Sequence, residues 1–172
     1  MPRRYALFLV IFLVFTAVRA LPNAPAIAKP RQRSDTALFI EISKRPLLSA
    51  EFWAGERPPT YPLYLKLADR SLYLASAFQL TFSILSWGAL ALVIASFLRS
   101  PALQVAAFAW TLLLSLVTHL AGWDFTILSE SLSITLFVLF TALGLWLMKD
   151  WQVWKAAVLV MLGLFLALTR DT

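Results

Sequence analysis

The chain has 172 residues, of which 60% are hydrophobic and 14% are charged, and its mean hydropathy is +0.78. Soluble domains are nearer half apolar and a quarter charged, and the apolar excess here lies in long runs that are typical of membrane proteins. The absence of cysteine and the single histidine, His119, exclude disulfides, thiolate chemistry and multi-histidine metal sites. The net charge of +6 forms no Lys/Arg block, so we expect membrane lipids or anionic ligands as partners and no nucleic acid.

The first apolar run covers residues 5–21 and follows an arginine pair. Its charge-free part, residues 5–18, is short for a membrane span, but the long side chain of Arg19 can reach the interface and extend it. A cleaved signal peptide is the alternative, because the arginine pair fits its start and Val18-Arg19-Ala20 fits a cleavage site. We favour a retained span, since several long apolar runs follow it.

Residues 22–75 are rich in proline and charge, and we expect them to form a loop outside the membrane. A helix over residues 36–44 would be capped by Ser34 or Asp35, and a second short helix would begin near Pro62. The apolar side chains of the loop are Leu38, Phe39, Ile42, Leu47, Leu48, Phe52 and Trp53. Their pattern predicts an amphipathic segment that lies along the membrane interface.

Four further apolar runs are separated by short polar turns. They predict membrane spans over residues 76–98, 101–121, 126–148 and 152–169. The tryptophans gather mainly near the predicted span ends, as an aromatic belt does. The sequence therefore predicts an all-α membrane protein with about five transmembrane helices, in a single membrane domain over residues 1–172.

The charge distribution does not decide the orientation of these spans by itself. If they alternate, the N-terminal side carries five of the fifteen basic residues and the side of the long loop carries ten. A plain count would place the loop in the cytoplasm, but long loops weigh less and the first helix with its arginine pair often dominates. We favour a cytoplasmic N-terminus and a loop on the other side.

Asp35 follows the basic residues Lys29, Arg31 and Arg33 and opens the expected loop helix. In a purely structural interpretation it caps that helix. In a functional interpretation it is a general base at the membrane surface, and the nearby cations attract an anionic substrate. The two interpretations are compatible, because a helix N-terminus also favours anions.

Three further positions are candidates for substrate binding. Arg57 stands before a proline-locked segment, either as part of a stiff loop or as a phosphate contact with a forked set of donors. Glu130 lies near the start of a span that has no further charge until its end. It is either a hydrated residue near the interface at a helix N-terminus or a carboxylate that faces a cavity. Arg170 ends the last span, where an interfacial anchor is the simpler interpretation. We expect Asp124 to be a turn or cap residue.

The order of these features resembles a known family. The resemblance rests on three segments: Ser34-Asp35-Thr36-Ala37-Leu38-Phe39 after the first span, Arg57-Pro58-Pro59-Thr60-Tyr61-Pro62 before the second, and Leu128-Ser129-Glu130-Ser131 followed by Thr169-Arg170. It points to the N-terminal part of the C-type superfamily of polytopic glycosyltransferases, which includes protein O-mannosyltransferases and aminoarabinose transferases. One departure is Phe39, which stands where a tyrosine is common in that family.

The resemblance implies an enzyme that transfers a sugar from a polyprenyl-phosphate donor to an acceptor outside the cytoplasm. Asp35 would be the catalytic base, and Arg57, Glu130 and Arg170 would shape the substrate site. It implies no certain cofactor and leaves a divalent metal open, and it points to a bacterial inner membrane. Members of the family have more spans than this sequence predicts, so we expect a fragment of a longer chain. The alternative is a small non-catalytic membrane protein, such as an assembly partner or a transporter-like subunit.

Overall fold

The computed structural model describes residues 3–55 and 57–169, and this part of the chain is helical and contains no β-strand. The long helices are α1 (Arg3–Ala20), α6 (Leu72–Ser96), α7 (Pro101–Leu114), α9 (Ser129–Lys149) and α10 (Val153–Ala167). The short ones are η1 (Leu21–Asn23), α2 (Ala24–Ala28), α3 (Thr36–Lys44), α4 (Ala50–Trp53), α5 (Thr60–Leu67), α8 (Thr118–Ala121) and η2 (Gly122–Phe125). The prediction of an all-α membrane protein is confirmed.

Among the residues that the structure describes, three helical segments are long and apolar enough to cross a membrane: Arg4–Ala28, Leu72–Ser96 and Ser129–Lys149. At 1.5 Å per residue, each exceeds or matches the roughly 30 Å of the hydrocarbon core. The apolar helices α7 and α10 have 14 and 15 residues, so each is about 21–23 Å long. The arrangement fits a multi-pass integral membrane protein.

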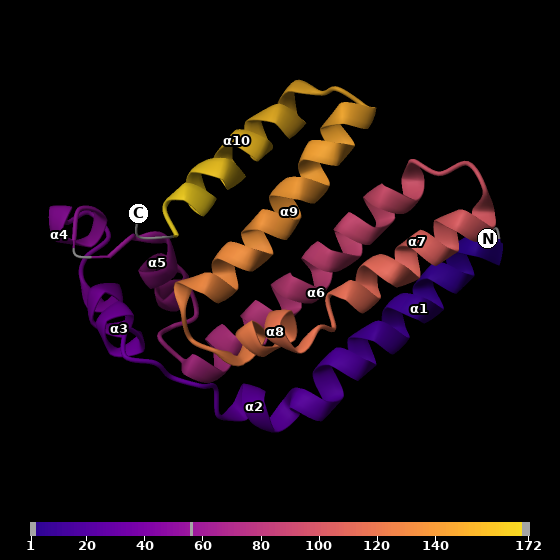
Figure 1. Cartoon of the computed structure of the whole chain (residues 1–172). Coiled ribbons are helices and arrows are strands. Elements are labelled where there is room, and N and C mark those ends of the chain that lie inside the picture. Colours follow the sequence, from indigo (N-terminus) through magenta and orange to yellow (C-terminus); the bar gives the residue numbers. More distant parts are fainter. Residues whose placement is uncertain (1–2, 56, 170–172) are drawn as a thin grey trace.

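The long helices run side by side, and their connections gather at two ends of the molecule (Figure 1). Helix α6 is central and packs against α7 and α9, while α1 covers α7 and α10 covers α9. The N-terminus, the α6–α7 turn and the α9–α10 turn lie at one end, and the short helices α2, α3, α5 and α8 lie at the other. The loop helices are therefore gathered at one end of the bundle.

Helix α3 has the predicted bounds, but its apolar face has a different role from the one expected. Phe39, Ile42 and Phe52 are buried inside the protein, whereas Leu47, Leu48 and Trp53 remain exposed. The aromatic ring of Phe39 meets that of Tyr61 at a centroid distance of 5.0 Å, which docks α3 on α5. The apolar pattern therefore only partly describes a surface along the membrane interface, because three of these side chains are buried and Phe39 joins a core shared with α5 and the start of α9.

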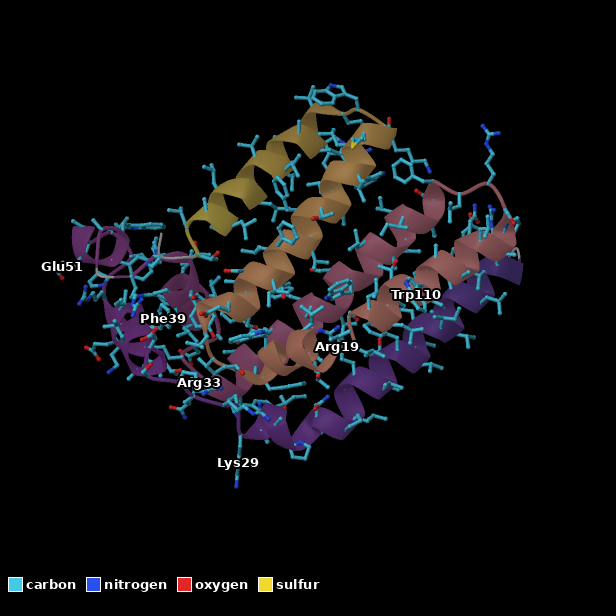
Figure 2. The ribbon with its side chains drawn as sticks, in the orientation of Figure 1. Arg19, Lys29, Arg33, Phe39, Glu51 and Trp110 are labelled. Carbon is cyan, nitrogen blue, oxygen red and sulfur yellow. The ribbon has the colours of Figure 1, made fainter. Side chains whose placement is uncertain are left out.

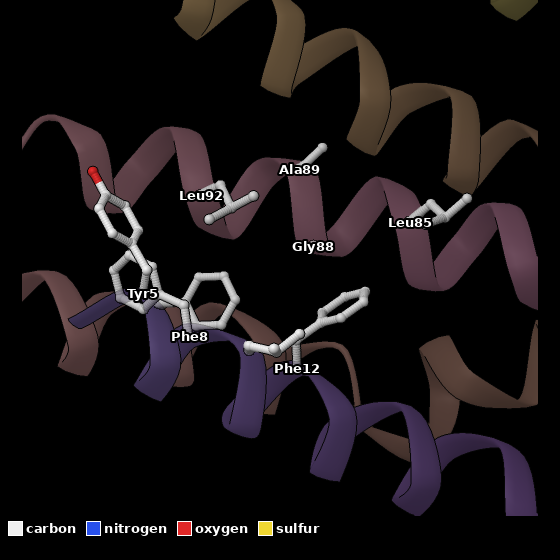
Figure 3. Close-up of a pocket in the computed structure, with 9 residues that line it drawn as sticks. Tyr5, Phe8, Phe12, Leu85, Gly88, Ala89 and Leu92 are labelled. Carbon is white, nitrogen blue, oxygen red and sulfur yellow. The ribbon is translucent and has the colours of Figure 1, made fainter. Parts of the chain in front are cut away.

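Helices α1 and α6 approach closely at Gly88. A Cβ atom at this position would lie 2.6 Å from Cε2 of Phe12, so the phenyl ring occupies the space that a side chain would need. Figure 3 shows Tyr5, Phe8 and Phe12 of α1 facing Leu85, Gly88 and Leu92 of α6. An apolar cavity of about 470 Å³ lies between them. Among the described residues, its lining offers no charged side chain by which a ligand could be recognised.

Candidate functional site

Asp35 lies at the N-terminus of α3, but its side chain does not cap the helix. Its backbone carbonyl accepts the first helical hydrogen bond, from the Phe39 amide at 3.0 Å. Within the described residues its carboxylate makes no capping bond, and Oδ1 instead lies 3.1 Å from Nη2 of Arg57. The carboxylate is therefore directed toward the other loop segment, and 41% of the side chain is exposed. A partly exposed carboxylate can exchange protons with a bound substrate.

Arg57 is held in place by the segment that leads into α5. Two prolines follow it, and proline restricts the backbone on both sides of the junction. Its side chain is 29% exposed, which leaves the Asp35–Arg57 ion pair at the surface of the protein. A guanidinium has five N–H donors in a planar fork, a geometry that suits the oxygens of a carboxylate or a phosphate.

Glu130 lies in the first turn of α9, where the partial positive charge of the helix terminus favours a carboxylate. The Ser129 hydroxyl donates to Oε2 of Glu130 at 3.2 Å. Burial raises the pKa of Tyr61, and the neighbouring Tyr64 and Glu130 raise it further. The Tyr61 phenol thus stays protonated and donates to Oε1 of Gln79 at 3.2 Å. Glu130 is therefore close enough to Tyr61, whose ring packs on Phe39, to contribute to its raised pKa.

The end of α10 reaches the same end of the bundle. The Ser133 hydroxyl donates to Oγ1 of Thr169 at 2.8 Å, and Thr60 at the start of α5 donates to the Phe165 carbonyl at 3.4 Å. These bonds join α10 to both α9 and α5. The fourth predicted site residue, Arg170, follows Thr169 and lies outside the described residues.

An apolar groove begins one turn beyond Glu130. It has a volume of about 540 Å³ and runs along α9 from Ser133 to Thr141, with Trp87 of α6 and Leu166 of α10 among its walls. The indole N–H of Trp87 is buried and has no hydrogen-bond partner among the described residues. The groove thus leads from the end of the bundle that carries Glu130 toward the middle of the helices.

The chain matches no protein-family model, no curated protein and no solved structure. The chemistry of the site therefore has to be argued from its own side chains. The structure brings Asp35 and Arg57 into direct contact and places Glu130 on a neighbouring helix end. Asp35 and Arg57 offer a proton acceptor and a cation suited to phosphate, and Glu130 offers a second carboxylate one turn before the start of a mainly apolar groove.

Arg19 was expected to extend toward the membrane interface, and this expectation was wrong. The side chain is buried, with the residue 2% exposed, and it lies among the helices (Figure 2). Its Nε and Nη2 contact Oδ2 of Asp124 at 2.9 and 2.7 Å, and Nη2 also donates to the Ser83 hydroxyl at 2.8 Å. Burial raises the pKa of Asp124, while Arg19 and Ser83 lower it.

The sequence also did not predict a network of buried polar side chains around Gln79. Gln79 of α6 donates to the Thr126 carbonyl at 3.1 Å and to the Ser131 hydroxyl, while it accepts from Tyr61. The Thr36 hydroxyl donates to the Ile127 carbonyl at 2.8 Å. These bonds join α6 to α5, to α9 and to the segment before α9, and they join α3 to that same segment. A glutamine inside a predicted span was the available signal, because a buried amide needs partners.

The described residues hold no group of three or more His, Asp or Glu side chains that could bind a metal ion. The backbone of Arg31, one of the three cations before Asp35, is bound to the segment before α9. Its backbone amide donates to the Phe125 carbonyl at 2.7 Å, and its carbonyl accepts from Ile127 at 2.9 Å. Its side chain lines a cavity together with Arg19.

Proposed function

We propose that this chain is the N-terminal membrane part of a glycosyltransferase that uses a polyprenyl-phosphate sugar donor. The observation that carries the proposal is the direction of the Asp35 side chain, which leaves its own helix uncapped and pairs with Arg57 at a partly exposed surface. A residue whose only task is to cap would bond to the amides of α3. The resemblance to the C-type superfamily supports the same assignment.

The proposed reaction transfers a glycosyl group between two oxygen atoms. The Asp35 carboxylate takes the proton of an acceptor hydroxyl, and the oxygen attacks the anomeric carbon of the sugar. The bond between that carbon and the phosphate oxygen breaks, and polyprenyl phosphate leaves with the bonding electrons. Arg57 stabilises the negative charge that develops on the phosphate. The proton leaves Asp35 to water after the product departs.

The groove along α9 supports a lipid-linked donor. Its walls are apolar, and it begins at Ser133, three residues after Glu130. From Ser133 to Thr141 the helix rises about 12 Å, enough to bury the first isoprene units of a donor whose phosphate lies near Arg57. In this proposal Glu130 and Arg170 contact the sugar or its phosphate.

The proposal places the loop outside the cytoplasm and the N-terminus inside, in a bacterial inner membrane. The arginine pair at the start of α1 supports this orientation, since basic residues beside the first helix favour the cytoplasmic side. The end of the bundle that carries Asp35 would then face the compartment in which lipid-linked sugars are consumed.

Asp35→Asn tests the function most simply. In the full-length protein, assayed in membranes with polyprenyl-phosphate-linked sugars, we expect transfer to fall by about 10²–10⁴-fold, because the amide cannot accept the proton. The matched control is Glu41→Gln, which removes a carboxylate from the exposed face of the same helix. Near-normal transfer by Asp35→Asn would exclude Asp35 as the base, and a non-catalytic membrane protein would show no transfer with either residue.

A further inference from the structure

Two cavities meet on the face of the bundle formed by α1 and α7, and both are lined by Val18 and Leu116. The first, the head cavity, has a volume of about 310 Å³ and is lined by Arg19, Asn23, Arg31 and Thr118 as well as by apolar residues. The second, the tail groove, has a volume of about 370 Å³, and the described residues that line it all have apolar side chains. The two cavities thus adjoin and form one site with a polar end and an apolar end.

The head cavity contains a cation with an unused donor. Arg19 is buried, and its Nε and Nη2 are bound to Asp124 and Ser83, but Nη1 has no partner among the described residues. A buried guanidinium nitrogen without an acceptor is costly, and an anion in the adjoining cavity would satisfy it once the Arg19 side chain turns toward that cavity. Arg31 adds a second guanidinium from a backbone that is fixed on both sides by hydrogen bonds.

The charge balance of the head cavity sets the charge of its ligand. Asp124 is paired with Arg19, so the two arginines that line the cavity and this carboxylate together carry a net charge of about +1. A group with a single negative charge fits this balance better than a dianion. The phosphodiester of a phospholipid carries one negative charge and has oxygens for two guanidinium groups.

The tail groove has the shape and direction that a hydrocarbon chain needs. It follows α1 from Val18 to Val10, where the helix rises about 12 Å away from the head cavity and toward the opposite end of the bundle. The opposite wall comes from α7, with Leu112 and Leu113. An apolar chain in this groove would lie parallel to the lipid chains of the bilayer.

We propose that the head cavity and the tail groove together bind an anionic phospholipid of the surrounding membrane. The phosphate contacts Arg31 and Nη1 of Arg19, and one acyl chain lies along α1. The two cavities are lined mainly by α1, α7 and the segments that follow these helices, whereas the groove beside α9 is lined mainly by α6, α9 and α10, and neither Asp35 nor Arg57 lines the head cavity or the tail groove. The phospholipid site does not depend on the proposed glycosyl transfer.

Native mass spectrometry of the full chain in detergent tests the site, with phosphatidylglycerol titrated against phosphatidylcholine. We expect the anionic lipid to bind more tightly, and Arg31→Gln to weaken it by roughly tenfold or more, because a charge-assisted hydrogen bond is lost. Arg33→Gln is the matched control, since it removes an exposed arginine two positions away. Both substitutions change exposed residues, so the fold should persist.

A second pair of variants tests the tail groove. Val14→Trp fills the groove and should weaken phosphatidylglycerol binding, whereas Val160→Trp, at an equally lipid-exposed position on α10, should leave it unchanged. Equal binding of the two lipids, or equal effects of Arg31→Gln and Arg33→Gln, would overturn the site. Displacement of the lipid by inorganic phosphate at the same concentration would show a simple anion site and would also overturn the proposal.

Discussion

Arg19 and Asp124 are separated by 105 positions in the sequence and form an ion pair inside the protein. Transfer of two charges from water into a protein interior costs several kcal/mol each, and only close contact and further hydrogen bonds offset this cost. Ser83 supplies one such bond, and the ring of Phe15 lies 5.7 Å from the guanidinium carbon. The pair joins the end of α1 to the segment before α9 and to α6.

Asp124→Asn should destabilise the protein strongly. It leaves the buried guanidinium of Arg19 without a counter-charge, and loss of one partner of a buried pair typically costs about 3–5 kcal/mol. Thermal unfolding in detergent should show a clear fall in the melting temperature. Glu41→Gln, which breaks an exposed pair with Lys44, should change it little. An unchanged melting temperature for Asp124→Asn would mean that the pair has no structural role.

This ion pair could not be predicted from the sequence. The position of Arg19 after an apolar run is equally compatible with a residue that reaches the interface, and nothing local connects it to a carboxylate in a later turn. By contrast, Asp35 and Arg57 could be singled out, since each stands at the start of a recognisable helix signal. Their contact depends on the docking of α3 on α5 through Phe39 and Tyr61, which the sequence leaves open.

At the scale of helices, the contact between α1 and α6 depends on a single missing side chain. Gly88 leaves room for the ring of Phe12, and small residues generally allow membrane helices to approach. Phe8 of α1 also stacks on Phe108 of α7 at a centroid distance of 4.8 Å. The aromatic face of α1 thus packs against both α6 and α7.

Gly88→Leu should separate α1 from α6. The larger side chain would collide with Phe12, and overpacking of this kind costs about 1–3 kcal/mol. The melting temperature in detergent measures the loss, and Phe12→Ala in the same chain should restore part of it. Gly144→Ala is the control, because a Cβ there would meet only Leu159 at an ordinary 3.9 Å. Equal effects of the two substitutions would exclude close packing at Gly88.

The ends of a helix could be predicted from the sequence where a polar residue marks them. They could not be predicted where the sequence remains apolar beyond the helix. The loop helix over residues 36–44 was predicted from its amphipathic pattern. Helix α6 begins at Leu72 rather than at 76, because the Ser71 hydroxyl accepts from the Leu74 amide at 3.3 Å. The expected span over 101–121 consists of α7, a turn after Leu114 and α8. The turn residues Leu116 and Val117 are apolar, so their sequence does not distinguish them from a continuing helix.

For the molecule as a whole, the sequence predicted that the informative residues would lie on one face of the membrane. In the structure the loop helices, the start of α9 and the end of α10 lie at one end of the bundle (Figure 1). Alternation of the spans suffices for this prediction. It does not determine which side chains touch, because that depends on the polar network of Gln79 and on the small core around Tyr61.

The orientation of the two ends decides whether Asp35 can act on donors outside the cytoplasm. The chain has no cysteine, so single cysteines report cleanly on each end. Ala50 and Trp151 are both exposed and lie at opposite ends of the bundle. In intact cells an impermeant maleimide should label Ala50→Cys at once and Trp151→Cys only after lysis. Labelling of Trp151→Cys from outside, with Ala50→Cys protected until lysis, would place the Asp35–Arg57 site in the cytoplasm and contradict the account.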